Sequence, residues 1–177
     1  MTRIAVVSDT HVPRFAHRLP AALAIVAAQR PAAILHCGDF TSLEAVSALE
    51  AMAPLEGVAG NNDGQEIVAR FARRTFITVD GARIGLVHGD GARGTTPQRA
   101  RAAFADESVA AILFGHSHIP SCQRSDNGWL INPGSPTDKR RQARFSFAVL
   151  DVECGTVLPR LIFFDTPAVP KRTRRAL

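Results

Sequence analysis

The sequence predicts an α/β fold in one domain, with a parallel sheet and a second sheet packed on it, and three observations point to it. In the first half, short apolar runs alternate with helical segments, which is typical of a parallel sheet covered on both faces. In the second half, extended runs that turn near Gly81 and Gly155 indicate antiparallel pairing, and hence a second sheet packed on the first. The 177 residues show no repeat, low-complexity segment or linker, so one domain over 1–166 is expected.

The expected elements follow from apolar periodicity and from turn and cap signals. They are, in order, a strand at 4–8, a helix at 19–30, a strand at 32–37, a helix at 41–52 opened by a Thr41-x-x-Glu44 capping box, a strand at 55–60 and a short helix at about 64–72. Next come a hairpin at 76–88, a helix with Thr96 as N-cap and Pro97 as its first residue, a strand at 110–114, and antiparallel strands at 128–132 and within 145–165.

Composition narrows the class of protein. A hydrophobic content of 46% with 21% charged residues is ordinary for a globular domain. The longest apolar run, 21–28, is too short to span a bilayer, and the N-terminus lacks the apolar core of a signal peptide, so we expect a cytoplasmic protein without a membrane partner. Its three cysteines have unrelated spacings that fit neither a disulfide framework nor a zinc knuckle, and Cys37 is expected to be a buried small hydrophobe.

Positive charge is concentrated in two places. The C-terminal segment 167–177 is expected to be a disordered basic tail, and its four Lys and Arg residues leave a net charge of only +1 for residues 1–170. A second basic cluster, Lys139–Arg144, lies inside the domain. Nucleic acid is therefore a conceivable partner through either segment, although neither establishes a nucleic-acid-binding domain.

Polar residues follow five of the predicted strands. In sequence order they are Asp9 and His11, Asp39, Asn61 and Asp63, His88, and His116 and His118. Positions i and i+2 of an extended chain share a face, and ligands in open α/β sheets gather beyond the carboxyl ends of the strands. A lone Asp or His there is usually a cap or turn residue. So many at five ends indicate a metal site, because clustered carboxylates repel one another unless cations intervene.

The kinds of donor predict the metal chemistry. Carboxylate, imidazole and amide ligands without thiolate favour Mn, Fe, Zn, Ni or Co, and we expect Mn as the preferred ion. The ligands number about twice what one ion needs. A pair of divalent ions ~3.5–4 Å apart is therefore expected, together with phosphoryl hydrolysis.

The same motifs resemble those of the calcineurin-like metallophosphoesterases. The match comprises Asp9-x-His11, Gly38-Asp39, Gly60-Asn61-x-Asp63, His88 and Gly115-His116-x-His118, and the segment INPGSPT at 131–137 resembles the compact prokaryotic phosphodiesterase branch. The resemblance implies a four-layer α/β/β/α sandwich of two mixed sheets, with the metal site at the carboxyl ends of the strands.

The resemblance also implies roles for these residues. Asp9, His11 and His118 would bind one metal ion, Asn61, His88 and His116 the other, and Asp39 would bridge them. A hydroxide held between the ions would attack phosphorus, with Asp63 orienting a histidine or the loop from behind.

Two positions depart from the family pattern. Asn62 stands where larger members carry histidine, and Asp90 stands where histidine is a more common choice in the family. An amide can contact a phosphoryl oxygen but cannot donate a proton at neutral pH. His17 is the alternative proton donor, in a loop that could overhang the site, and Arg93 in the Gly-rich loop 89–96 is a candidate substrate contact. His36 is expected to be a satisfied core histidine.

The leading hypothesis is a two-metal phosphodiesterase acting on a small phosphodiester. Two alternatives stay open: a nuclease, if Lys139–Arg144 forms a basic track beside the metals, and a non-catalytic scaffold of the same fold. The complete set of ligands counts against the scaffold. The sequence is compatible with a homo-oligomer.

Overall fold

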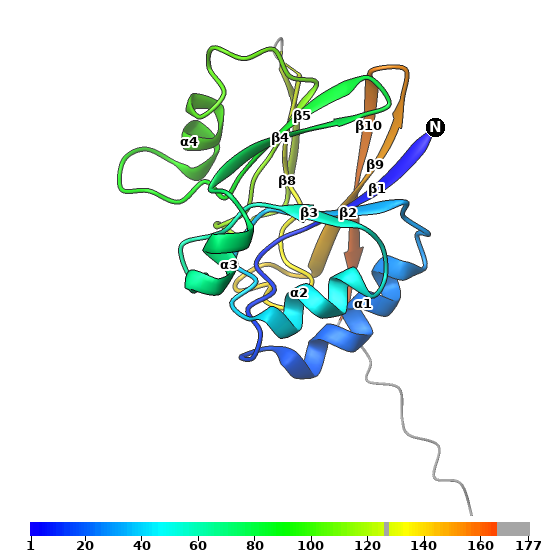
Figure 1. Cartoon of the computed structure of the whole chain (residues 1–177), viewed down its shortest axis with the longest axis vertical. Helices are drawn as coiled ribbons and strands as arrows, with labels where there is room; N and C mark the ends of the chain where they lie inside the picture. The colour runs from blue at the N-terminus through cyan, green and yellow to red at the C-terminus, as the bar shows by residue number, and fades with distance from the viewer. Residues whose placement is uncertain (126–127, 166–177) are drawn as a thin grey trace, which may run out of the picture.

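Two five-stranded mixed sheets pack face to face in the computed structural model, which describes residues 1–125 and 128–165 (Figure 1). The first sheet has the order β10-β9-β1-β2-β3 and the second β4-β5-β6-β8-β7. The strands are β1 (Thr2–Val7), β2 (Ala33–His36), β3 (Leu55–Gly57), β4 (Arg74–Val79), β5 (Ala82–Val87), β6 (Ala111–Leu113), β7 (Ser121–Ser125), β8 (Gly128–Asn132), β9 (Phe145–Glu153) and β10 (Thr156–Phe164). The helices are η1 (Ala16–Arg18), α1 (Leu19–Ala27), α2 (Leu43–Glu50), α3 (Gln65–Arg70) and α4 (Thr96–Ala102). The predicted tail at 167–177 lies outside the described residues.

Alternating side chains along the strands divide the core into layers. Along β1, Ala5 and Val7 face α1 and α2, while Ile4 and Val6 face the second sheet. Phe104, two residues beyond the end of α4, packs with Ala100 of α4 and with residues of β6 and β8 on the outer face of that sheet. Figure 1 accordingly shows α1 and α2 on one side of the molecule and α4 on the other. The α/β/β/α order is confirmed.

The C-terminal hairpin joins a different sheet from the one expected. β9 and β10 turn at Cys154-Gly155 as predicted, but β9 pairs antiparallel with β1 and so extends the first sheet. The strand at 128–132, expected to be antiparallel, is β8 and runs parallel to β6. It is antiparallel only to β7, a strand that the polar sequence SCQRS did not predict. Apolar pattern alone does not specify which edge a hairpin adopts.

Both predicted helix caps are displaced by one residue. The N-cap of α2 is Ser42, whose Oγ accepts from the Ala45 N–H, while Thr41 adopts φ 66° and donates its hydroxyl to the Val12 carbonyl. The N-cap of α4 is Thr95, which forms a reciprocal capping box with Gln98. The Thr41–Glu44 box is therefore wrong, because the strand-end loop already uses Thr41.

Strand direction brings the polar residues to one edge of the two sheets. β1, β2 and β3 run parallel in the first sheet, and β5 and β6 run parallel in the second. Their carboxyl ends meet, since residues that follow β6 contact residues that follow β1. Among the described residues, no helix is long and apolar enough to cross a membrane.

His36, at the end of β2, is fully buried in the core as predicted. Its Nδ1 accepts the Gly38 N–H at 3.1 Å, so the ring proton lies on Nε2, 3.2 Å from the Thr10 hydroxyl. The ring also stacks on Phe40 with centroids 3.6 Å apart. Burial lowers the pKa of His36 to about 3, so the imidazole is neutral in the folded state.

This burial predicts an acid sensitivity of the fold. Because the folded pKa of His36 lies below its unfolded value, the unfolded state binds more protons, and stability falls as the pH drops through 6.5 toward 3. We expect the contribution to reach ~2 kcal/mol at pH 5. Urea unfolding in chelator, at pH 7 and pH 5, should show a smaller pH loss for H36Q than for the wild type. Equal losses of unfolding free energy in H36Q and the wild type would contradict the role of His36 in this acid sensitivity.

Candidate metal centre

The Asp9 carboxylate is fully buried, and only one of its oxygens is satisfied. Oδ2 accepts from the Ser8 hydroxyl at 2.6 Å and from the His116 backbone N–H at 3.1 Å. Oδ1 has no hydrogen-bond partner among the described residues. A buried carboxylate oxygen without a partner costs free energy, so this position favours a cation.

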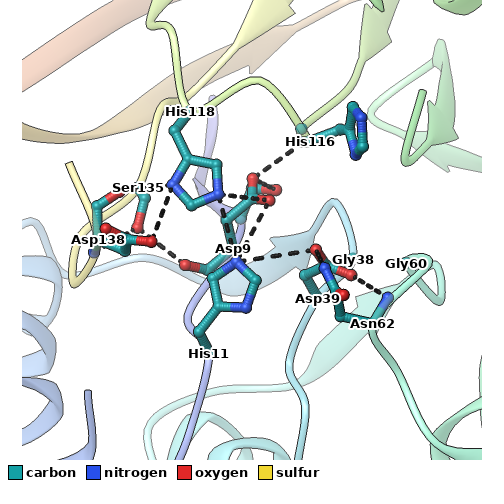
Figure 2. A network of polar contacts seen from close by, with 12 residues as sticks. Asp9, His11, Gly38, Asp39, Gly60, Asn62, His116, His118, Ser135 and Asp138 are labelled. Atoms are coloured by element: carbon teal, nitrogen blue, oxygen red, sulfur yellow. Dashed lines mark hydrogen bonds and ion pairs between the residues drawn. The ribbon is translucent and has the colours of Figure 1, made fainter. Parts of the chain in front are cut away.

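His118 and His11 direct ring nitrogens at this oxygen (Figure 2). His118 Nδ1 lies 2.5 Å from the Asp138 carbonyl, which can only accept, so Nδ1 carries the proton and Nε2 presents a lone pair. That Nε2 lies 3.2 Å from Asp9 Oδ1 and 3.2 Å from His11 Nε2. Electron-rich atoms at such distances repel unless a cation lies between them.

A second group of donors forms beside the first. His88 donates Nδ1–H to the Cys37 carbonyl at 2.7 Å, so Nε2 is the nitrogen that can bind a metal ion, and it lies 3.2 Å from Asn61 Oδ1. His116 Nδ1 lies 2.9 Å from the same amide oxygen. Two imidazoles and one amide oxygen therefore converge.

Asp39 lies between the two groups. Its Oδ2 is 3.3 Å from His88 Nε2 and 3.7 Å from His11 Nε2. Asn62 holds this carboxylate from the other side, with its backbone N–H on Oδ1 at 2.8 Å and its amide Nδ2 on Oδ2 at 2.7 Å. All seven predicted ligands are thus brought together, with Asp39 at the position that a bridging ligand would need.

The donor set fits divalent transition-metal ions. Bonds of about 2.0–2.2 Å to N and O ligands place neighbouring ligand atoms about 3 Å apart, similar to the separations here. Asp9, His11 and His118 would hold one ion and Asn61, His88 and His116 a second, with Asp39 reaching both. Ions held in this way supply Lewis-acid chemistry.

Electrostatics at the centre favour positive charge. Burial would raise the pKa of Asp9, but contact with His118 and the charge of His88 hold it below its usual value. Burial likewise opposes the ionisation of Asp39, yet His88 and Asn62 keep its pKa low. Burial would lower the pKa of His88, but Asp39 and Asp9 raise it to about 9, so without a metal ion its Nε2 carries a proton that a bound ion would displace. Both carboxylates therefore stay ionised.

Most of the ligands occupy left-handed backbone conformations. Asp9, His11, Asp39, His116 and His118 have φ between 48° and 64°. This region is uncommon for residues other than glycine, although Asp and His visit it more than most, and its use here marks a functional site. Hydrogen bonds from Asp9 N to the Gly38 carbonyl and from His11 N to the Asp39 carbonyl hold the two loops together beyond the strand ends.

Asp63 supports the site from behind through the loops. Its carboxylate accepts from the backbone N–H groups of Asp39, Thr41 and Gly60 at 2.6–2.9 Å and contacts no histidine in the described hydrogen-bond network. Burial raises its pKa. Asp63 therefore fixes the Asp39 loop to the Asn61 loop.

The segment 131–137 forms a second support, which the sequence did not identify. Ser135 Oγ donates to the Asp9 carbonyl at 2.9 Å and Thr137 Oγ1 to the Thr10 carbonyl at 2.7 Å. Asn132 donates its Nδ2 to the Gly115 carbonyl, so it holds the histidine loop without joining the donor groups. The INPGSPT motif was the feature of the sequence from which this supporting role could have been predicted.

Other predicted site residues lie elsewhere. His17 is exposed on η1 and, within the described residues, does not line the cavity beside the ligands. Arg93 contributes its carbonyl to a loop whose interior is filled by the Arg99 guanidinium, which donates to Gly89, Arg93 and Gly94 carbonyls. The carbonyl groups of the Gly-rich loop are therefore engaged by a side chain of α4. Asp90 is exposed, and its charge acts on His116.

An open cavity of about 700 Å³ adjoins the centre. Its walls come from both supporting loops: His11, Pro13, Arg14, Thr41, Asn62, Asp138 and Arg140. The cavity is polar and carries two guanidinium groups, of which Arg14 was not singled out from the sequence.

Gly115 provides a test of how closely these loops pack. A Cβ atom there would lie 1.9 Å from Ser8 Oγ and 2.8 Å from Asp9 Oδ2, whereas a Cβ at Gly64 would meet nothing within 4 Å. We expect G115A to lose ~1–3 kcal/mol of stability and to weaken metal binding, because Asp9 must move. The double variant S8A/G115A should recover part of the lost stability and part of the lost metal affinity. The control variant G64A should bind metal like the wild type. Thermal unfolding and Mn²⁺ titration measure these effects, and wild-type metal affinity in G115A would contradict the packing argument.

Comparisons with known proteins agree with this geometry. Residues 2–155 match the calcineurin-like phosphoesterase superfamily domain. A probable metallophosphoesterase from Methanothermobacter thermautotrophicus is 37% identical over 138 residues, which are 77% of this chain and 78% of that protein. An archaeal phosphodiesterase of known structure is 22% identical, with a TM-score of 0.75 over 92% of this chain and 100% of that one. Vps29 from Entamoeba histolytica complexed with Zn²⁺ is 21% identical, with a TM-score of 0.66 over 93% and 100%. The chain therefore belongs to the calcineurin-like phosphoesterase superfamily.

Proposed function

We propose that this protein is a phosphodiesterase that depends on two divalent transition-metal ions, with Mn²⁺ preferred. The observation that carries the proposal is the unpartnered Asp9 Oδ1, which faces two imidazole nitrogens beside a second donor group at Asp39. When bound, two such ions activate water and stabilise negative charge on a phosphoryl group. Membership of the superfamily supports phosphoester hydrolysis.

The chain's own residues orient the reacting groups. Asn62 fixes both oxygens of Asp39, and Asp138 fixes the ring of His118 through its carbonyl. Arg14 and Arg140 add positive charge to the cavity beside His11. A small phosphodiester placed there would have its phosphoryl group near the donor atoms and one ester arm in the cavity.

The nuclease alternative receives limited support from the basic cluster at Lys139–Arg144. Lys139 Nζ donates to the Gln142 carbonyl and Arg144 to the Phe163 carbonyl, so both are engaged within their own loop and β10. Arg140 alone of this cluster lines the cavity. A longer strand of nucleic acid would therefore meet a short basic track, and we favour a small substrate.

The scaffold alternative requires an activity measurement. Since a Vps29 of similar fold was solved with Zn²⁺, retention of metal does not by itself distinguish an enzyme from an interaction module. Hydrolysis that depends on Asp39 does distinguish them.

The direct test uses bis(p-nitrophenyl) phosphate with the metal-free protein and added Mn²⁺. We expect hydrolysis to require the metal, to disappear in excess chelator, and to fall by at least ~100-fold in D39N, because Asp39 reaches both donor groups. The matched variant D106N, at an exposed aspartate after α4, should keep wild-type activity. Equal rates after dialysis against chelator would refute the proposal.

The cavity also predicts how the rate depends on the leaving group. Its described lining contains no free proton donor: His11 is a metal ligand, Asp138 faces His118 and Arg140, and Asn62 is an amide. The value of kcat/KM should therefore rise steeply as the leaving-group pKa falls across substituted phenyl diesters. N62H should recover part of the ~10²–10⁴-fold typical of general acid catalysis, mainly for poor leaving groups. A flat dependence, with P–O cleavage rate-limiting, would mean that another acid acts.

A further inference from the structure

Two guanidinium groups share the cavity beside the metal centre, and their surroundings leave an excess of positive charge. Arg140 Nε lies 3.8 Å from Asp138 Oδ2, but that carboxylate also lies 3.6 Å from His118 Nδ1. Arg14 forms no ion pair with any described residue, and its guanidinium rests 5.2 Å from the centre of the Phe15 ring. Asp138 is therefore the one carboxylate in the described lining of a cavity that holds two arginines, and it is already shared between Arg140 and His118.

Both arginines are positioned by the loops that carry the metal ligands. Arg14 follows His11 by three residues, and the Phe15 N–H donates to the His11 carbonyl at 3.0 Å. Arg140 follows Asp138, whose Oδ1 accepts the Arg140 backbone N–H at 3.3 Å. Their distance from the ligands is therefore set by the fold of the site.

The remaining walls favour a polar occupant. In the described lining of this cavity of about 700 Å³, Pro13 is the one apolar residue, and Thr41 and Asn62 add to the polar surface. A volume of this size accommodates much more than one phosphoryl group. A polar ester arm that carries its own negative charge matches this lining.

Resting on the proposed function, we infer that Arg14 and Arg140 select phosphodiesters that carry a second phosphate on the retained ester arm. The scissile phosphate would lie at the metal ligands, and the second phosphate would accept hydrogen bonds from the two guanidinium groups. Arginine suits this role because its planar fork pairs with phosphate oxygens.

The test compares substrates with one leaving group. Thymidine 5′-(p-nitrophenyl phosphate) is measured with Mn²⁺ against its 3′-phosphorylated analogue and against a dinucleotide in which the added phosphate is an internal diester. We expect kcat/KM to be ~10-fold higher for the 3′-phosphorylated ester, mainly through KM and less so at high salt. An equal gain for the dinucleotide assigns the second phosphate to a nucleic acid strand, and a gain with the 3′-phosphate alone assigns it to a small phosphorylated ester.

Variants locate the effect. R14Q and R140Q should each lower the preference several-fold, and the double variant should abolish it. R101Q, on α4 at the outer face of the second sheet, should retain it. Calorimetry of the Mn²⁺-loaded proteins should show that the wild type and R101Q bind thymidine 3′,5′-bisphosphate more tightly than thymidine 5′-phosphate. This difference in affinity should shrink in R14Q and R140Q and disappear in the double variant.

The outcomes separate the two proposals. Preferential binding without hydrolysis would support the arginine pair and refute the phosphodiesterase. Equal affinity of the wild type for both nucleotides, or an equal loss of preference in R101Q, would overturn the arginine pair.

Discussion

The structure depends on the contact between Asp9 Oδ1 and His118 Nε2, two electron-rich atoms 3.2 Å apart in a buried place. Neither can turn away. Asp9 is fixed through Oδ2 by Ser8 and the His116 N–H, and His118 is fixed through Nδ1 by the Asp138 carbonyl. Without a metal ion, a proton on His118 Nε2 must lie between them; a metal ion would displace that proton and bond to both atoms, and the same reasoning applies to Asp39 and His88 in the neighbouring group.

Holding these atoms together requires backbone that is unfavourable by itself. Left-handed conformations cost about 1–2 kcal/mol per residue, and five of the ligands adopt them. Packing around the loops offsets this cost: Asp63 accepts three backbone N–H groups, and Ser135 and Thr137 bind the carbonyls of the first loop. The sheets contribute parallel strands whose carboxyl ends meet, so that residues far apart in sequence converge.

Much of this arrangement could be predicted from the sequence, and the remainder has a common physical reason. The apolar strands and the polar residues that end them predicted two sheets and the candidate ligands, because both follow local periodicity, whereas the order of the four layers was implied by the family resemblance. The sheet joined by β9 and β10, the strand β7, and the supports at Ser135 and Asp138 depend on pairings between distant segments. Arg14 and the exposed position of His17 depend on loop conformation, on which a single sequence carries little information. The Thr41 cap was wrong for the same reason, since the hydroxyl serves a tertiary contact.

The central claim is that these residues form one centre for two metal ions. Anomalous diffraction from crystals grown with Mn²⁺ tests it most directly, because it locates each ion independently of activity. The account predicts two anomalous peaks ~3.5–4 Å apart, one beside Asp9, His11 and His118 and the other beside Asn61, His88 and His116, with Asp39 between them. A single peak at saturating Mn²⁺, or ions bound away from Asp9 and Asp39, would contradict it.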